Sequence, residues 1–391
     1  MKYHLLVYLS LGLLSTLSGQ KVQDTLSWHY LSIEEGLLNN RVHTICQDQF
    51  GFLWLGTSGG LNRFDGYEFE SFVYEAADST TLSHNYVSRV FEDSYGNLWV
   101  GTDYGLNLLS EDRRSFQRFL PDEEDMSQLS SGAIACIFED SERNLWIGTW
   151  DGSLHLFDRT NQTFSRFSDP EYTGLRSIVE EENGNLILGF NWLGILYFDK
   201  KRKKLWKGPL TSLVYGKKIT KLLKDRNDQL WIGSKKGLSL YKQDASALQE
   251  FPVDPLQKGA LNSEIIVDLQ ERDNGQIWVA TDGGGLNVYD VEKESFSGLP
   301  LLNRTHGLNN RSVTQIYTDQ SQRTWLGTAN GGLVQQEMYR KQIEHYTYEK
   351  GNETGLSGTS VIALSEGKDG GIWIGLDHGG LNYLDRTTGR F

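Results

Sequence analysis

One short phrase returns along the chain at nearly regular intervals, and it constrains the fold more than any other feature. The phrase "GNLWVGT" at residues 96–102 comes back as "RNLWIGT", "DQLWIGS", "GQIWVAT" and "RTWLGT". Its tryptophan, with one apolar substitute, recurs every 41 to 48 residues, at Trp54, Trp99, Trp146, Ile187, Trp231, Trp278, Trp325 and Trp373. A period in the forties with several short strands per unit is typical of the blades of a β-propeller.

A single repeat, residues 87–119, indicates how one blade is built. Its segments "VSRVFED", "LWVGT", "LNLLS" and "SFQRF" are rich in β-branched and aromatic residues, and polar turns separate them. No helical period is present, so the pattern predicts four β-strands per repeat. Since a blade contacts a neighbour on each face, its strands are nearly continuously apolar, and a tryptophan fills the widening gap between blades. We therefore predict that the seven repeated tryptophans are structural.

The first strand-like segment, "LSWHYLS" at residues 26–32, resembles the outer strand that ends other repeats. We expect it to complete the last blade and so close the ring. The predicted fold is all-β: a seven-bladed β-propeller with four-stranded blades over residues 26–341, followed by the first blade of a truncated second propeller over residues 342–391. The alternative is a single eight-bladed ring. The first arrangement is favoured because the chain stops at "TTGRF", in the middle of a repeat.

Net charge and the first residues bear on partners and location. The formal net charge of −13 would repel a phosphate backbone, which excludes nucleic acid as a partner. Residues 1–19 have the order of a secretory signal peptide, with Lys2, an apolar run and small residues, and an uncleaved anchor is the alternative. We expect a periplasmic protein, attached to the membrane only if a longer chain exists. Cys46 and Cys136 are predicted to be buried thiols, with a disulfide as the alternative, and no spacing suits a metal or another cofactor.

Two stretches of the chain resemble a known family. "SRVFEDSYGNLWVGTDYGLNLL" at residues 88–109 and "GLLNNRVHTICQDQFGFLWLGTSGGLNRFDGYEF" at residues 36–69 are similar to the two-component regulator propeller repeat. The resemblance implies the exported sensor region of a bacterial hybrid two-component histidine kinase, with a membrane-spanning kinase region as its partner in a phosphorelay. The chain departs from the family pattern because it ends in the eighth repeat. No kinase lies within these residues, so no enzyme activity is expected of the chain itself.

Candidate ligand-binding residues stand in the turns between the second and third strands, which we expect at one mouth of the central channel. Most of these turns are small and polar, but two carry a tryptophan that the repeat does not need. Exposed rings beside amides and carboxylates suit the apolar faces and hydroxyl edges of a sugar. The predicted carbohydrate site consists of Tyr104, Trp150, Asp151, Asn191, Trp192 and Lys235. The alternative is that the two rings plug the channel or lie under longer loops.

The links ahead of each repeat are expected at the same mouth. Their polar side chains would bind an anion or a sugar, or would cap the turn into the next strand. These residues are Asn40, Arg41, His84, Asn85, Asn310 and Arg311. A separate basic run at residues 200–204 is interpreted as a solvated turn, with a charged docking patch as the alternative.

The enzyme hypotheses are weaker than the sensor hypothesis. Asp93, Gly96 and Trp99 are similar to an Asp-box but have an extra residue, and we interpret them as a hairpin turn. No pair of carboxylates is singled out for glycoside hydrolysis, so no catalytic residue is assigned. The sequence favours a non-catalytic periplasmic sensor of a carbohydrate or another small extracytoplasmic ligand, and a homodimer stays an open question. The alternatives are a secreted protein-interaction scaffold and, third, a propeller glycoside hydrolase or lyase.

Overall fold

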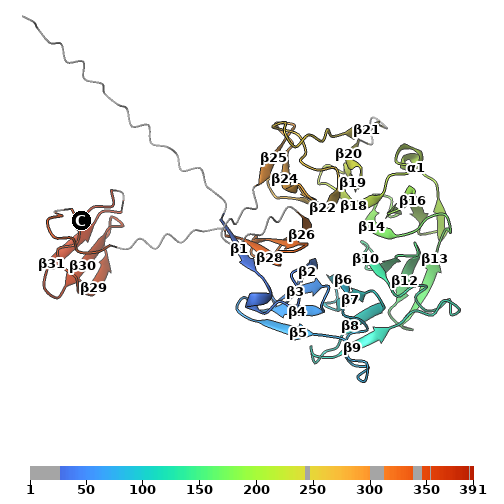
Figure 1. Cartoon of the computed structure of the whole chain (residues 1–391), viewed down its shortest axis with the longest axis horizontal. Coiled ribbons are helices and arrows are strands. Elements are labelled where there is room, and N and C mark those ends of the chain that lie inside the picture. The colour runs from blue at the N-terminus through green and yellow to red at the C-terminus, as the bar shows by residue number, and fades with distance from the viewer. Residues whose placement is uncertain (1–26, 243–246, 300–311, 338–345, 353, 387) are drawn as a thin grey trace, which may run out of the picture. The chain divides into compact units, whose positions relative to one another are not determined.

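The structure is a computed structural model, and it describes residues 27–242, 247–299, 312–337, 346–352, 354–386 and 388–391. The chain divides into two compact units, of which the first ends at Met338 and the second begins at Tyr339. The described residues form seven four-stranded antiparallel sheets and one three-stranded sheet. In the first unit the sheets stand side by side around a centre, as the blades of a propeller do (Figure 1).

In blades one to six the chain runs from the inner strand to the outer one. Blades one and two consist of β2 (Val42–Gln47), β3 (Leu53–Thr57), β4 (Leu61–Phe64), β5 (Phe69–Phe72), and β6 (Val87–Glu92), β7 (Leu98–Thr102), β8 (Gly105–Leu109), β9 (Phe116–Phe119). Blades three and four consist of β10 (Ile134–Glu139), β11 (Leu145–Thr149), β12 (Leu154–Asp158), β13 (Thr163–Phe167), and β14 (Leu175–Glu180), β15 (Leu186–Phe190), β16 (Gly194–Asp199), β17 (Lys204–Trp206).

Blades five and six consist of β18 (Ile219–Lys224), β19 (Leu230–Ser234), β20 (Gly237–Lys242), β21 (Ala247–Glu250), and β22 (Ile266–Glu271), β23 (Ile277–Thr281), β24 (Gly285–Asp290), β25 (Ser295–Leu299). Blade seven consists of β26 (Val313–Thr318), β27 (Thr324–Thr328), β28 (Leu333–Glu337) and β1 (Ser27–Leu31). Two short helices lie outside the blades, η1 (Ile33–Glu35) and α1 (Pro209–Leu213).

The first strand closes the ring, as the sequence predicted. β1 pairs antiparallel with β28, from Ser27 opposite Glu337 to Leu31 opposite Leu333, and so becomes the outer strand of blade seven. Blade seven also contacts blade one, because the side chain of Gln315 accepts a hydrogen bond from the backbone N–H of Ile45 at 2.6 Å. The prediction of a seven-bladed, four-stranded propeller is therefore confirmed.

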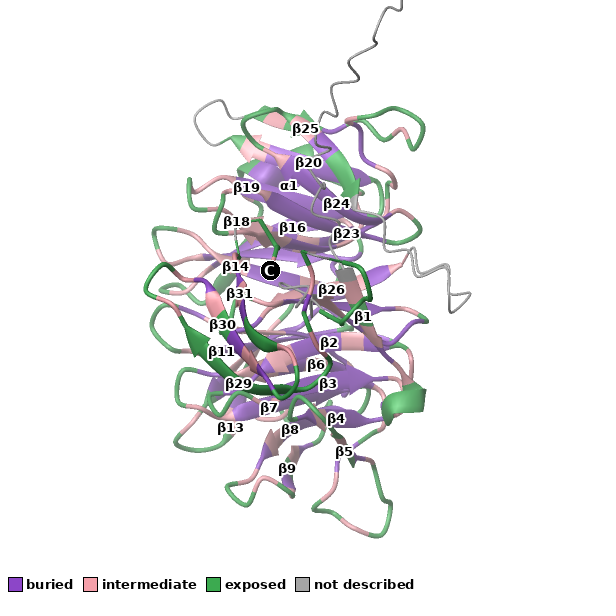
Figure 2. Ribbon diagram, turned by 90° about the vertical axis from the view of Figure 1, so that its left-hand side faces the viewer, coloured by how far each residue is buried: buried purple, intermediate pink, exposed green. Residues whose placement is uncertain are grey.

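The second strand of each blade is buried from end to end, as the apolar phrase of the repeat requires. Figure 2 shows buried residues along the strands and exposed residues gathered in the loops. The glycine of the phrase lies against the next blade: a Cβ atom on Gly101 would stand 2.6 Å from the side chain of Ile134. Only a residue without a side chain allows the blades to approach so closely.

The turn between the first and second strands holds the repeated tryptophan. In five blades an aspartate side chain accepts the indole N–H six residues later at 2.7–2.9 Å: Asp48, Asp93, Asp140, Asp225 and Asp319 bind Trp54, Trp99, Trp146, Trp231 and Trp325. The other oxygen of Asp93 accepts the backbone N–H groups of Tyr95 and Asn97. The interpretation of this motif as a hairpin turn is thus confirmed. We call the side of the ring that carries these turns the Asp-turn face.

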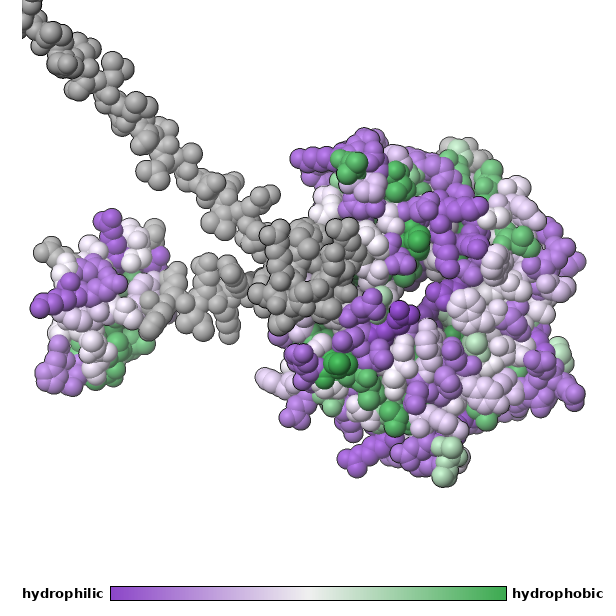
Figure 3. Space-filling view, viewed as in Figure 1, coloured by the Kyte–Doolittle hydropathy of each residue, from purple (hydrophilic) through white to green (hydrophobic). Residues whose placement is uncertain are grey.

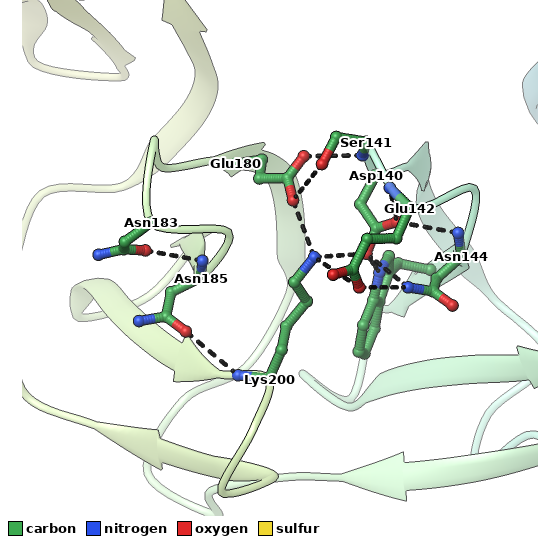
Figure 4. A network of polar contacts seen from close by, with 9 residues as sticks. Asp140, Ser141, Glu142, Asn144, Glu180, Asn183, Asn185 and Lys200 are labelled. Atoms are coloured by element: carbon green, nitrogen blue, oxygen red, sulfur yellow. Dashed lines mark hydrogen bonds and ion pairs between the residues drawn. The ribbon is translucent and has the colours of Figure 1, made fainter.

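Cations from neighbouring blades neutralise three of these aspartates. Arg113 forms an ion pair with Asp48, and Arg159 with Asp93 at 2.6 Å. Lys200 lies 3.0 Å from Asp140 and 2.8 Å from Glu180, and so joins blades three and four (Figure 4). The basic run at residues 200–204 is therefore only partly the solvated turn that was predicted. Residues 201–204 are exposed, but Lys200 serves as an ion pair between blades.

The second unit contains β29 (Val361–Glu366), β30 (Ile372–Leu376) and β31 (Gly380–Leu384). Its inner strand β29 is exposed along its whole length, and Trp373 is 43% exposed, whereas the equivalent Trp54 is fully buried. The expected outer strand that begins at Gln342 starts outside the described residues. So does the predicted signal peptide at residues 1–19.

Candidate functional site

The predicted site residues lie on the side of the ring opposite the Asp-turn face. In every blade, a backbone N–H just after the second strand donates to the carbonyl of the residue just before the inner strand. The pairs are Ser58 with Arg41, Asp103 with Tyr86, Trp150 with Ala133, Asn191 with Gly174, Lys235 with Lys218, Asp282 with Ile265 and Ala329 with Ser312. The turns between second and third strands therefore surround the end of the channel at which the inner strands begin. We call this side the Trp150 face.

The six predicted residues stand in these turns but differ in their surroundings. Tyr104, Trp150 and Trp192 are 53%, 39% and 50% exposed, and Lys235 is exposed as well. Asn191 is buried. The carboxylate of Asp151 accepts the hydroxyl of Ser153 at 2.9 Å and that of Thr149, so it holds its own turn.

A cation covers one face of each exposed tryptophan. The guanidinium carbon of Arg176 lies 4.9 Å from the ring centroid of Trp150, and the Lys218 Nζ lies 3.9 Å from that of Trp192. Both distances are within the range of cation–π attraction. The two rings are therefore held in place by neighbouring positive charge.

The link residues mostly cap their own turns. Asn40 accepts the backbone N–H of Ile33, His84 that of Tyr86, and Asn85 that of Tyr74. This agrees with the commoner use of such residues, in which a polar side chain satisfies the backbone of a turn. Asn310 and Arg311 lie outside the described residues.

The inner strands enclose a cavity of about 710 Å³ along the channel. Figure 3 shows the opening at the centre of the ring, bordered by hydrophilic residues. Every inner strand contributes the equivalent position to the wall, namely Thr44, Arg89, Cys136, Ser177, Lys221, Asp268 and Gln315. Of the six predicted ligand-binding residues, Trp150 is the one that lines this cavity in the part of the chain that the structure describes.

This wall position normally joins neighbouring blades. The side chains of Thr44, Ser177 and Asp268 accept the backbone N–H of Val90, Leu222 and Ile316 in the next blade at 2.9–3.2 Å. Arginine and lysine have no acceptor atom, so Arg89 and Lys221 cannot make this bond. Lys221 instead joins two blades through an ion pair with Asp268 at 2.8 Å. Arg89 therefore differs from these residues, because it neither accepts a backbone N–H of the next blade nor forms an ion pair with that blade.

The residue that precedes this wall position lies at a β-bulge in each inner strand. At this bulge position too, one blade has a cation where others have a small polar residue. Ser88 and Thr220 donate from this bulge to the carbonyl oxygens of Ile134 and Ile266 in the next blade, both at 2.7 Å. Blade four has Arg176 here, against the ring of Trp150. Blade one has His43, whose Nε2 lies 2.8 Å from the hydroxyl of Ser58 and whose ring lies 4.4 Å from that of Tyr86.

The charges of this wall are not balanced. Among the described residues, neither Arg89 nor Arg176 forms an ion pair with a carboxylate, and Arg89 donates to the carbonyl of Ser88 at 2.7 Å. Burial, and next the repulsion from Arg89, lower the pKa of Arg176 to about 10. Burial and the charges of Arg89, Arg41 and Arg176 lower the pKa of His43 to about 4, so His43 is neutral at pH 7. The channel is thus a positive region in a chain of net charge −13.

Sequence reasoning missed Arg89, Arg176 and His43 because it compared the turns and not the inner strands. The signal is present in the repeat: when the phrases are aligned on the tryptophan, Arg89 stands where Thr44 and Ser177 stand in other blades. The alignment shows two cations in this column, Arg89 and Lys221.

The arrangement is suited to binding. Two carboxylates line the cavity, Asp268 and Glu180, and each is engaged by a lysine at 2.8 Å. Within the described ranges, no group of three or more His, Cys, Asp or Glu side chains could hold a metal ion.

Both cysteines are free thiols, Cys136 buried and Cys46 partly buried. Across the part of the chain that the structure describes, no helix is long and apolar enough to span a membrane.

The fold and these repeats define the class of the protein. It is a seven-bladed β-propeller, and three of its segments, residues 36–59, 81–104 and 128–151, match the model of the two component regulator propeller family. The predicted resemblance is confirmed. Histidine kinase P4 of Formosa agariphila is 28% identical over 193 residues, which cover 46% of this chain and 14% of that protein.

Solved structures share the fold. The extracellular domain of the hybrid two-component system BT3049 from B. thetaiotaomicron has a TM-score of 0.68 and 23% identity over 93% of this chain and 54% of that one. A streptogramin B lyase has a TM-score of 0.60 and 13% identity over 80% of this chain and 97% of its own. The chain therefore spans about half of the two-component domain. At these identities the likeness shows the fold and not the ligand.

Proposed function

We propose that this chain is the periplasmic, ligand-sensing propeller region of a two-component sensor, and that its ligand is a carbohydrate bound at the Trp150 face. The observation that carries the proposal is that Trp150 and Trp192, which the repeat does not need, are exposed on the face where the channel opens. Aromatic rings held in place by neighbours offer flat apolar surfaces to a sugar, and the polar turns around them offer hydrogen-bonding groups.

The comparisons support a signalling role. A match to a histidine kinase and a fold shared with the extracellular domain of a hybrid two-component system suit a sensor that passes its signal to a kinase region in the same protein. The ring is closed by β1 and joined by side chains between blades, so it would move as a body when a ligand binds. A change in how two copies of the sensor contact each other would then carry the signal.

A thermal-shift screen of the purified chain against oligosaccharides tests the proposal, since a ligand that binds only the folded state raises the melting temperature. We expect a sugar that raises it for the wild type and not for Trp150→Ala or Trp192→Ala. Trp206→Ala is the matched control, because Trp206 is similarly exposed, at 42%, but lies on the outer strand β17. If no sugar shifts the folded wild type, or if the control loses the shift equally, the carbohydrate proposal fails and a protein-interaction scaffold is favoured.

A further inference from the structure

We propose that Arg89 and Arg176 form an anion-binding site inside the channel, and that the ligand of the Trp150 face is an acidic oligosaccharide whose carboxylate or sulfate group they hold. The acidic-sugar part of this inference rests on the proposed function. The anion site does not, because it follows from the charges of the channel wall.

The first argument is the cost of the two guanidinium groups. A charge that is partly taken out of water without an ion-pair partner loses hydration and destabilises the folded state, and Arg89 and Arg176 are each half-buried. Arg89 and Arg176 line the same cavity, and Arg89 is close enough to lower the pKa of Arg176 by repulsion. The fold does not require either cation, since other blades have Thr44 or Ser177 at the first position and Ser88 or Thr220 at the second. Two repelling cations at sites where the repeat accepts small polar residues indicate a ligand of opposite charge.

The second argument is the hydrogen-bonding capacity that remains. A guanidinium carries five N–H donors in a planar fork that matches a carboxylate or sulfate. In the described part of the chain, Arg89 uses its Nη1 on the carbonyl of Ser88, and Arg176 contacts the ring of Trp150. Both therefore keep donors for an acceptor in the cavity.

The remaining groups around the cavity offset the two positive charges only in part. Asp268 attracts Arg89, but its ion pair is with Lys221, and Glu180 forms its ion pair with Lys200. His43 is neutral at pH 7, and burial raises the pKa of the Cys136 thiol to about 11, so neither supplies a negative charge.

The third argument is that an aromatic ring lies next to one of the two arginines. Trp150 lines the same cavity and contacts Arg176, so a sugar ring that stacks on Trp150 would bring an acidic substituent to the guanidinium. The cavity of about 710 Å³ is within the size range of small-molecule sites. An acidic oligosaccharide is the ligand that uses both the ring and the charges.

Isothermal titration calorimetry on the purified chain tests the inference with four probes: a neutral cello-oligosaccharide, an oligogalacturonate, a sulfated galacto-oligosaccharide and inorganic sulfate. We expect an acidic oligosaccharide to bind, with affinity that falls as salt is added. Arg89→Met and Arg176→Gln should each weaken binding at least about tenfold, and Arg176→Lys should restore part of it because the charge is kept. Arg159→Gln, a cation of the Asp-turn face, should leave affinity unchanged. The melting temperature of each variant reports whether it is folded.

The outcomes separate this inference from the proposed function. If a neutral sugar binds as tightly as the acidic ones and the Arg89 and Arg176 variants keep that affinity, the carbohydrate proposal stands and the anion site is overturned. If sulfate binds in a way that depends on Arg89 and Arg176 but no sugar does, the anion site stands and the carbohydrate proposal falls. If no probe binds the folded chain, the anion site is overturned.

Discussion

The Asp-turn face and the channel differ in whether their cations have ion-pair partners. On the Asp-turn face, Arg113, Arg159 and Lys200 each reach a buried carboxylate of the neighbouring blade. In the channel, Arg89 and Arg176 have no such partner among the described residues. The same residue types therefore serve two purposes. Cations that join blades, Lys221 of the channel wall included, have an ion-pair partner inside the protein, whereas Arg89 and Arg176 gain one only if an anion from outside binds.

The largest loss of folding stability is expected on the Asp-turn face, where each buried carboxylate is fully paired. Asp93→Ala removes the acceptor of the Trp99 indole and of two backbone N–H groups, and it leaves Arg159 without its closest partner. Each buried donor left without its acceptor costs about 1–3 kcal/mol, so the loss of the indole and backbone bonds together should cost about 3–5 kcal/mol. Denaturant unfolding should show a loss of this size. A loss below about 1 kcal/mol would mean that this face does not hold the blades together as described.

The buried His155 is an uncharged group with which the charged residues of the two regions can be compared. His155 accepts the backbone N–H of Ser130 at 3.0 Å, as Asn107 does for Ser83 in blade two, and burial lowers its pKa to about 4. The folded state thus binds the proton less well than the unfolded chain does. Stability should be fully present above about pH 6.5 and fall by up to about 3 kcal/mol as the pH drops to about 4.

His155→Asn keeps the hydrogen-bond acceptor and removes the titrating group, so it should abolish this part of the acid sensitivity. Urea unfolding at several pH values measures the effect. An unchanged slope of stability against pH would contradict the role of burial at His155.

A matched pair of substitutions tests the contrast directly. Arg159→Gln should destabilise the protein by about 1 kcal/mol, since the partly exposed cation loses its bonds to Asp93 and Glu139. Arg176→Gln should be neutral or stabilise by less than about 1 kcal/mol, because it relieves repulsion in the channel. Both are measured by denaturant unfolding. Equal destabilisation by the two changes would remove the difference between the two sides of the ring.

The smallest effect concerns His43 and needs no ligand. Its pKa is lowered by burial and then by Arg89, Arg41 and Arg176, whereas Arg176 has no part in lowering that of His155. Arg176→Gln should therefore raise the pKa of His43 and leave that of His155 unchanged. Histidine NMR titration gives both values in one sample. A His43 pKa that does not move would show that the channel carries no strong positive potential.

The architecture could be predicted from the sequence because it repeats. The spacing of Trp54, Trp99 and their equivalents gave the blades, and the likeness of residues 26–32 to an outer strand predicted the closure that β1 and β28 form. Each of these features reflects a local packing need that recurs in every blade, so one chain supplies its own comparison.

The wall of the channel was harder to predict. The turns drew attention to Trp150 and Trp192, but whether a cation such as Arg89 is paired depends on which side chain of the adjacent blade lies beside it. Lys221 and Arg89 occupy equivalent positions, yet only Lys221 has an aspartate in the next blade, Asp268. No local pattern of sequence distinguishes these two cations, and the ring geometry does.

The central claim is that the channel holds uncompensated positive charge between Arg89 and Arg176. A crystal of the chain soaked in bromide tests it most directly, because anomalous scattering locates the anions without a known ligand. The account predicts a strong peak in the channel against the two guanidinium groups, and none at Arg159, whose charge is already matched. Bromide confined to exposed lysines of the surface, with the channel free of it, would contradict the account.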